Sequence, residues 1–204
     1  MTAERSTAED DLAFVRRLTA LDQGPAWRRA FGRMYALWGF AFGVPLLFEW
    51  ARWAGYLELP RDFWLWCALA VTLLMTGLGV YFARRDGPVV GVQPRALNAV
   101  FAGAGLANVV MLATLLATAF HIGDFRILML HASIVFAFQG AAWYVVWALR
   151  KQLWAGLLAA GWSVTAIALG VTLATPNFLL IAALGLLLLM GAPGVLMWRA
   201  PVPE

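Results

Sequence analysis

The 204-residue sequence is poor in charge, in cysteine and in histidine. Charged residues make up 13% of the chain, against roughly 25% in soluble domains. Cys67 is the single cysteine, which excludes an intrachain disulfide and a cysteine-based metal cluster. Because there are two histidines, a histidine-based metal or haem site is restricted to His121 and His131. Hydrophobic residues supply 63% of the chain, so water is not expected to be its main solvent.

Long apolar segments dominate the chain and predict six transmembrane helices. A crossing of roughly 30 Å of hydrocarbon needs about 20 apolar residues in a helix. The runs are continuous, without the alternation of a membrane β-barrel, so the backbone must satisfy its hydrogen bonds as helices. The fold class is therefore an all-α, polytopic transmembrane bundle occupying residues 25–204. The expected spans are residues 34–56, 63–83, 96–121, 126–149, 153–175 and 177–198.

The basic residues predict the orientation of this bundle. If the amino terminus is cytoplasmic, twelve of the 15 Lys and Arg residues fall on the cytoplasmic side. Such a bias in short loops is what the positive-inside rule expects. We therefore expect both termini on the cytoplasmic side of the membrane. Because the basic residues flank apolar segments, they do not indicate a nucleic-acid-binding face.

Residues 1–24 predict a cytoplasmic amphipathic helix ahead of the first span. Ser6 and Glu9 have capping-box spacing, and Gly24 with Pro25 supplies a stop signal. The apolar stripe of this helix is expected to dock on the bundle, to contact a cytoplasmic or membrane protein partner through residues 7–22, or to lie on the inner leaflet. The stripe consists of Leu12, Phe14, Val15, Leu18 and Leu21.

The segment from Asp10 to Leu18, with the sequence Asp-Asp-Leu-Ala-Phe-Val-Arg-Arg-Leu, resembles the opening of an uncharacterised family of small bacterial six-span membrane proteins. The resemblance covers this helix and the general hydropathy plan. It implies that the protein lies in a bacterial inner membrane. It does not imply an activity or any functional residue.

Small residues at four-residue spacing predict where helices pack, because lipid provides no hydrophobic force between them and close backbone approach is needed. Pro45 and Pro193 are each expected to kink a span, since proline lacks the backbone donor. The 11 tryptophans are read mainly as an interfacial belt, although an aromatic ligand cage would form if several met on facing helices at one depth. The predicted packing faces are Ala36, Gly39 and Gly43; Ala68, Thr72 and Thr76; Ser133, Ala137 and Ala141; and Gly161, Thr165, Ala168 and Thr172.

Polar residues within or beside the spans are the candidate functional residues, because such groups are costly to insert into a bilayer. An outer polar cluster is predicted, in which Glu49 pairs with Arg52, and Asp124 with Arg126 forms a turn. His121 and His131 are the candidate metal ligands, and His131 alternatively forms a hydrogen bond between helices. The candidates for a ligand site or an ion path are Glu49, Asn98, Asn108, His131 and Gln139.

The sequence contains no phosphate-binding glycine loop, zinc-protease signature, serine elbow or paired intramembrane carboxylates. Enzymatic chemistry is therefore the less favoured class, and no cofactor is predicted. The preferred interpretation is a non-enzymatic membrane component, either a small transporter or a sensing or partner-binding subunit. The alternative is a protein that binds haem or a divalent metal through His131 and His121.

Overall fold

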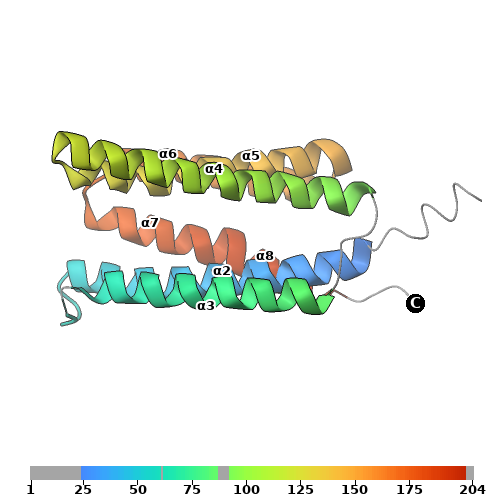
Figure 1. Ribbon diagram of the computed structural model, residues 1–204, viewed down its shortest axis with the longest axis horizontal. Helices are drawn as coiled ribbons and strands as arrows, with labels where there is room; N and C mark the ends of the chain where they lie inside the picture. The colour runs from blue at the N-terminus through green and yellow to red at the C-terminus, as the bar shows by residue number, and fades with distance from the viewer. Residues whose placement is uncertain (1–23, 61, 87–91, 201–204) are drawn as a thin grey trace, which may run out of the picture.

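The computed structural model describes residues 24–60, 62–86 and 92–200, and these residues form a bundle of long helices (Figure 1). The 3₁₀ turn η1 (Phe125–Met129) precedes α5, and the π-helical turn η2 (Leu187–Gly191) separates α7 from α8. The helices are α2 (Gly24–Trp53), α3 (Phe63–Asp86), α4 (Val92–Ile122), α5 (Leu130–Arg150), α6 (Leu153–Val171), α7 (Pro176–Leu186) and α8 (Ala192–Arg199).

In the part of the chain that the structure describes, six helical segments have the length and apolar composition of membrane spans, which agrees with the six predicted spans and makes the chain a polytopic membrane protein. The first helix begins earlier than the predicted residue 34, at Gly24. Its 30 residues extend about 45 Å at helical rise, more than the hydrocarbon thickness. The predicted helix over residues 7–22 lies outside the described residues.

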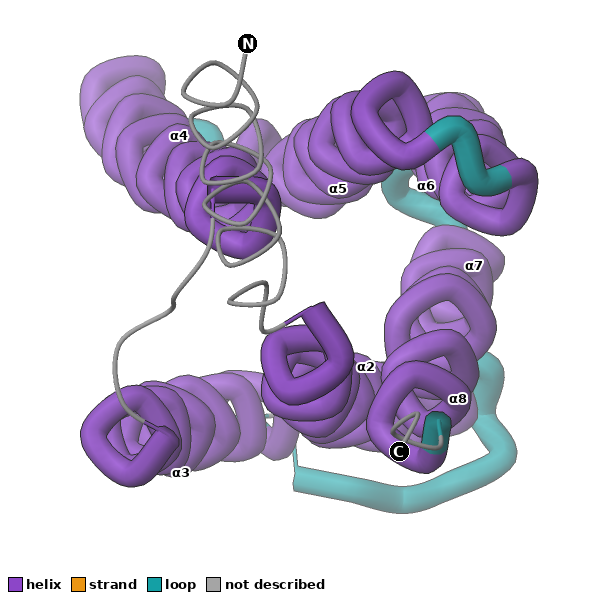
Figure 2. The backbone as a smooth tube through the Cα atoms, turned by 90° about the vertical axis from the view of Figure 1, so that its right-hand side faces the viewer, coloured by secondary structure: helices purple, strands orange, loops and turns teal. Residues whose placement is uncertain are grey.

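The helices form two layers with a connecting helix between them. Figures 1 and 2 show α4, α5 and α6 in one layer, α2, α3 and α8 in the other, and α7 between the layers. The most extensive contacts join α5 to α6 and join α2 to the three parts of the sixth span. Among the described residues, α3 packs mainly against α2 and has one buried residue, Met75.

Glycine residues bring the first and sixth spans into backbone contact. A Cβ on Gly32 would lie 2.6 Å from Met197 Cβ, and a Cβ on Gly39 would collide with the backbone of Gly191. The predicted packing face on the first span is therefore confirmed. The face predicted on α3 is wrong, because Thr72 and Thr76 are exposed while α3 turns Met75 toward the bundle.

The sixth span is interrupted where Pro193 predicted a kink. Proline has no N–H to donate to the carbonyl four residues earlier, and its ring clashes with that carbonyl. The chain widens into the π-helical turn η2 just before Pro193, and α8 then begins at Ala192. Pro45 lies inside α2, which continues through it as one helix.

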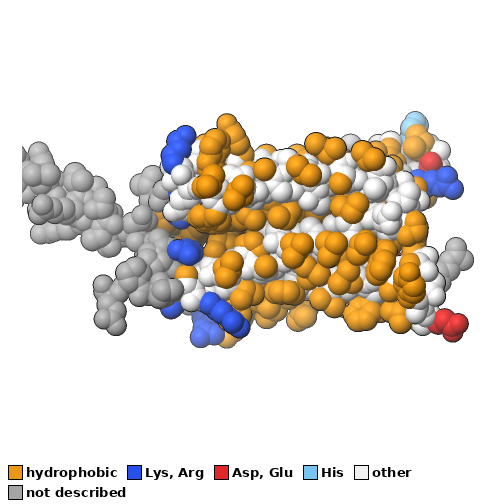
Figure 3. All heavy atoms as spheres, turned by 180° about the vertical axis from the view of Figure 1, so that it is seen from behind, with side chains coloured by type: hydrophobic (Ala, Val, Ile, Leu, Met, Phe, Trp, Pro, Cys, Tyr) orange, Lys and Arg blue, Asp and Glu red, His pale blue; other side chains and the backbone are white. Residues whose placement is uncertain are grey.

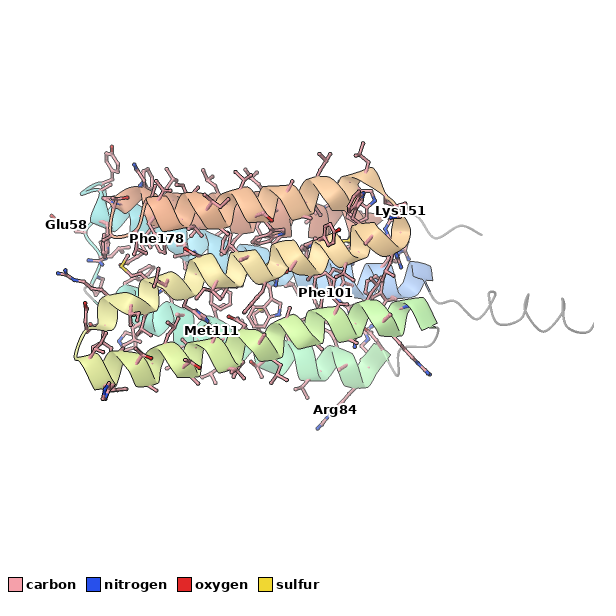
Figure 4. All side chains as sticks on the ribbon, turned by 90° about the horizontal axis from the view of Figure 1, so that it is seen from above. Glu58, Arg84, Phe101, Met111, Lys151 and Phe178 are labelled. Carbon is pink, nitrogen blue, oxygen red and sulfur yellow. The ribbon has the colours of Figure 1, made fainter. Side chains whose placement is uncertain are left out.

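The two ends of the bundle differ in charge. Figure 3 shows most Lys and Arg side chains at one end, and Figure 4 places Arg84 and Lys151 at that end with Glu58 at the other. We call the first the basic end. There, Arg33 Nη2 donates to Asp86 Oδ2 at 2.6 Å, and the Arg33 guanidinium carbon lies 3.8 Å from the Phe82 ring centroid. This contact joins α3 to α2.

Candidate functional site

Three aromatic residues form a stack along the first part of α2. Trp27, Phe31 and Tyr35 are spaced by four residues, so their side chains lie on one face of the helix. The ring centroids of Trp27 and Phe31 are 5.0 Å apart, and those of Phe31 and Tyr35 are 5.2 Å apart. The stack provides one wall of an aromatic cluster near the basic end.

Rings from three other helices complete this cluster. Phe101 of α4, on the side of α4 that faces α5 in Figure 4, has its ring centroid 4.7 Å from that of Phe31. Trp143 of α5 lies 5.6 Å from Phe101, and Trp154 of α6 lies 5.4 Å from Trp143. Aromatic residues on facing helices therefore meet at one depth, which is the arrangement that the sequence alone left open. The four-residue spacing of Trp27, Phe31 and Tyr35 was the one sequence signal for it.

The cluster encloses a pocket of about 40 Å³. Its walls come from both layers of the bundle, so it exists only in the folded protein. Its polar lining consists of Arg28, Arg150 and Gln152. The apolar lining consists of Trp27, Phe31, Phe101, Trp143, Val146, Trp154 and Met197.

The polar lining residues are positioned by aromatic neighbours and by helix ends. The Arg150 guanidinium carbon lies 5.5 Å from the Trp27 ring centroid, within cation–π range. Gln152 follows Arg150 and Lys151 in the short turn between α5 and α6, and its Oε1 accepts a hydrogen bond from Trp154 Nε1 at 3.0 Å. Arg28 is exposed near the start of α2. The pocket thus has an aromatic interior and a basic, polar rim.

Two of the candidate polar residues meet in the interior of the bundle. The His131 imidazole lies beside the backbone of Asn108, where α5 packs against α4. Asn108 Oδ1 and His131 Nε2 are buried and have no hydrogen-bond partner. Gln139 Oε1 is also buried and unpartnered. Such groups are costly in an apolar surrounding, so they mark a position suited to a polar ligand or water.

The remaining path candidates lie elsewhere. Glu49 is 5% exposed, and its carboxylate accepts hydrogen bonds from Arg52 and from Trp53 Nε1 on the same helix. Asn98 is exposed on the surface of α4. The pocket near the basic end is not lined by Glu49, Asn98 or His131.

The outer polar residues form two local structures. Glu49 and Arg52 form the predicted ion pair, three residues apart on α2. Asp124 Oδ1 accepts a hydrogen bond from the backbone N–H of Arg126 at 2.9 Å, so Asp124 caps η1 as the predicted turn. His121 is exposed. Within the described residues, no three His, Cys, Asp or Glu side chains gather in a potential metal site.

No known family, curated protein or solved structure matches this chain.

Proposed function

We propose that this protein is a non-enzymatic, multi-pass membrane component that binds the head of a membrane amphiphile in the aromatic pocket. The observation that carries the proposal is the convergence of rings from four helices on one pocket with a polar rim. Of the two versions that the sequence leaves open, a small transporter and a sensing or partner-binding subunit, this proposal takes the second. The likeness of residues 10–18 to six-span bacterial proteins supports an inner-membrane location.

The orientation belongs to the same proposal, with the basic end in the cytoplasm. The positive-inside rule relates short basic loops to the cytoplasmic face. The exposed cations at the basic end come from the ends of five helices, so no single loop produces the bias. They are Arg28, Arg29, Arg84, Arg85, Arg95, Lys151 and Arg199. The pocket then opens at the level of the inner leaflet.

The size of the pocket favours an amphiphile over a soluble metabolite. Pockets that enclose soluble ligands usually measure about 300–1,000 Å³, whereas this pocket measures about 40 Å³. One water molecule occupies about 30 Å³ in the liquid. An amphiphile needs to place only part of its head in the pocket, because its chains remain in the bilayer.

Native mass spectrometry of the purified protein tests this function. Val146→Trp fills the pocket, since Val146 is a buried lining residue, and it should abolish retention of a co-purified amphiphile. Val164→Trp is the matched control, because Val164 is 65% exposed on α6. Trp154→Leu removes the partly exposed indole that forms one wall of the pocket, and it should also reduce retention of the amphiphile. Equal retention in wild type, Val146→Trp and Trp154→Leu, each eluting as a monodisperse species, would contradict the proposal.

A second candidate function, binding of haem or a divalent metal through His131 and His121, is supported by the buried, unpartnered Nε2 of His131. An imidazole nitrogen with a free lone pair is a metal ligand. Absorption spectra and elemental analysis of purified protein test this candidate. If the purified protein shows neither a Soret band nor bound metal, the haem- or metal-binding function is rejected. It is also rejected if His131→Ala changes only the stability of the protein.

Residues 7–22 are proposed as the contact for a protein partner, on the strength of their apolar stripe. Cross-linking in native membranes, with full-length protein and a variant lacking residues 7–22, tests this contact. Identical cross-linked products from the two proteins would remove it. The small-transporter version of the function is supported only by the contact between Asn108 and His131.

A further inference from the structure

Trp143 of α5 is the wall of the pocket that contacts rings from all the surrounding helices. Its ring centroid lies between 5.4 and 6.2 Å from those of Phe31, Tyr35, Phe101 and Trp154. All four contacts are edge-on, with interplanar angles between 64° and 73°. Aromatic pairs favour this arrangement because the ring edge is positive and the ring face is negative. The neighbouring rings therefore fix the plane of the Trp143 indole.

These ring contacts do not decide which edge of the indole points in which direction. The torsion that turns a tryptophan ring about its bond to Cβ is broad and roughly two-fold. A half-turn keeps the ring plane but exchanges the edge that carries Nε1 with the bulkier benzene edge. The N–H is the one polar group of the indole, and it can only donate. A hydrogen bond from Nε1 is therefore the contact that distinguishes the two orientations.

Tyr35 supplies the acceptor for this hydrogen bond. Trp143 Nε1 donates to the Tyr35 hydroxyl at 2.6 Å, and both residues are buried. The indole of Trp162 lies beside the same hydroxyl, yet its Nε1 has no hydrogen-bond partner, and Trp162 does not line the pocket. The hydroxyl of Tyr35 is thus bonded to the indole that forms the pocket wall.

Tyr35 is held on a closely packed part of α2. Gly32 and Gly39 lie on either side of it in the sequence, and a Cβ on either glycine would collide with the backbone of the sixth span. The Tyr35 ring also stacks on Phe31, with centroids 5.2 Å apart. Tyr35 itself does not line the pocket. Any effect of its hydroxyl on binding must therefore pass through a lining residue.

We infer that Tyr35 is a positioning residue for the aromatic pocket, because its hydroxyl selects the orientation of the Trp143 indole that admits the amphiphile head. The inference rests on the proposed function and adds to it a residue outside the pocket lining. The pocket measures about 40 Å³, so placing the benzene edge where Nε1 now lies would change the shape of its wall.

Nuclear magnetic resonance of the full-length protein in detergent micelles, with ¹⁵N-labelled tryptophan, reports the orientation directly. Wild type should give one downfield indole N–H signal for Trp143, assigned by its loss in Trp143→Phe. Tyr35→Phe should shift this signal upfield and split or broaden it, because the indole then samples both orientations. Glu49→Ala is the control for lowered stability, since Glu49 lies toward the other end of the same helix, and it should leave the signal unchanged.

Native mass spectrometry measures how delipidated protein takes up a phospholipid extract of the expression host. Tyr35→Phe should weaken uptake about two- to tenfold, the range expected when one net hydrogen bond no longer favours the competent orientation. In a Trp143→Phe background the same substitution should have no further effect, because a phenyl ring has no N–H to orient. Glu49→Ala should take up lipid as wild type does.

Three results would overturn the inference: wild-type uptake by Tyr35→Phe, an unchanged Trp143 signal in that variant, or an equal loss of uptake in Glu49→Ala. A full further loss from Tyr35→Phe in the Trp143→Phe background would also overturn it, because Tyr35 would then act independently of the indole. If Val146→Trp and Trp154→Leu left uptake unchanged, the proposed function would fail. The Trp143 signal, recorded without lipid, would still show whether Tyr35 orients the indole.

Discussion

Trp143 Nε1 donates a hydrogen bond to the Tyr35 hydroxyl at 2.6 Å, and this bond connects α5 in one layer to α2 in the other. Trp143 is 2% exposed and Tyr35 is 5% exposed. Their ring centroids are 5.6 Å apart, so the pair combines a hydrogen bond with an edge-on aromatic contact. The pair lies beside the pocket and holds one of its walls in position.

Tyr35→Phe should lower the free energy of unfolding by about 0.6–2 kcal/mol, because the Trp143 N–H is left buried without its acceptor. The measurement is the unfolding midpoint in mixed micelles on titration with a denaturing detergent. Tyr144→Phe is the control, since Tyr144 is 57% exposed on the same helix as Trp143. Equal midpoints for the two variants would show that the bond contributes nothing.

Gly39→Ala should destabilise the contact between α2 and the sixth span by about 1–3 kcal/mol. The new methyl group would overlap the backbone of Gly191, which has no flexible side chain to move aside. Gly77→Ala on α3 is the matched control, because nothing lies within 4 Å of a Cβ there. Thermal unfolding in detergent should separate the two variants, and a Gly39→Ala protein as stable as Gly77→Ala would contradict the described packing.

Glu49→Ala should reduce stability more than Glu58→Ala. Glu49 accepts hydrogen bonds from Arg52 and Trp53 although it is buried, whereas Glu58 is exposed in the following loop. Removing the carboxylate leaves those donors unpaired, at a cost of about 1–3 kcal/mol. Unfolding of the two variants side by side gives the comparison. A larger loss of stability in Glu58→Ala would show that the hydrogen bonds of Glu49 with Arg52 and Trp53 do not stabilise the end of α2.

Single cysteines placed at the two ends of the bundle should react with a membrane-impermeant maleimide from opposite sides. In a Cys67→Ser background, Glu58→Cys should be labelled in intact spheroplasts, and Arg84→Cys only after the membrane is opened. Figure 4 shows these two residues at opposite ends. Labelling of Arg84→Cys in intact spheroplasts would contradict the proposed orientation and support the opposite one.

Much of the helical framework was predictable because local chemistry dictates it. A backbone in hydrocarbon must bond to itself, so apolar runs such as 96–121 and 153–175 predicted helices that the structure contains as α4 and α6. Helix ends were less predictable. The first span was predicted to begin at residue 34, yet a helix can continue into the polar interface, and α2 also includes Arg28, Arg29 and Arg33.

The candidate site was much harder to predict, because it depends on which helix faces meet. Thr72 and Thr76 have the spacing of a packing face but are exposed, whereas Gly39 has the same kind of spacing and contacts Gly191. Sequence spacing identifies residues that share a face, and it does not indicate whether another helix covers that face. Phe101 and Trp154 carry no local signal that they meet around one pocket.

The amino-acid sequence alone determined that this protein lies in a lipid bilayer, how many spans it has and how its charges are distributed. Each of these depends on composition and on the length of the apolar segments. Tertiary structure alone decided that Trp27, Phe101, Trp143 and Trp154 surround one pocket. The physical reason is the distance along the chain over which each interaction acts. Backbone hydrogen bonding and hydrocarbon thickness act within a segment, whereas a pocket requires side chains distant in sequence to reach the same depth on adjoining helices.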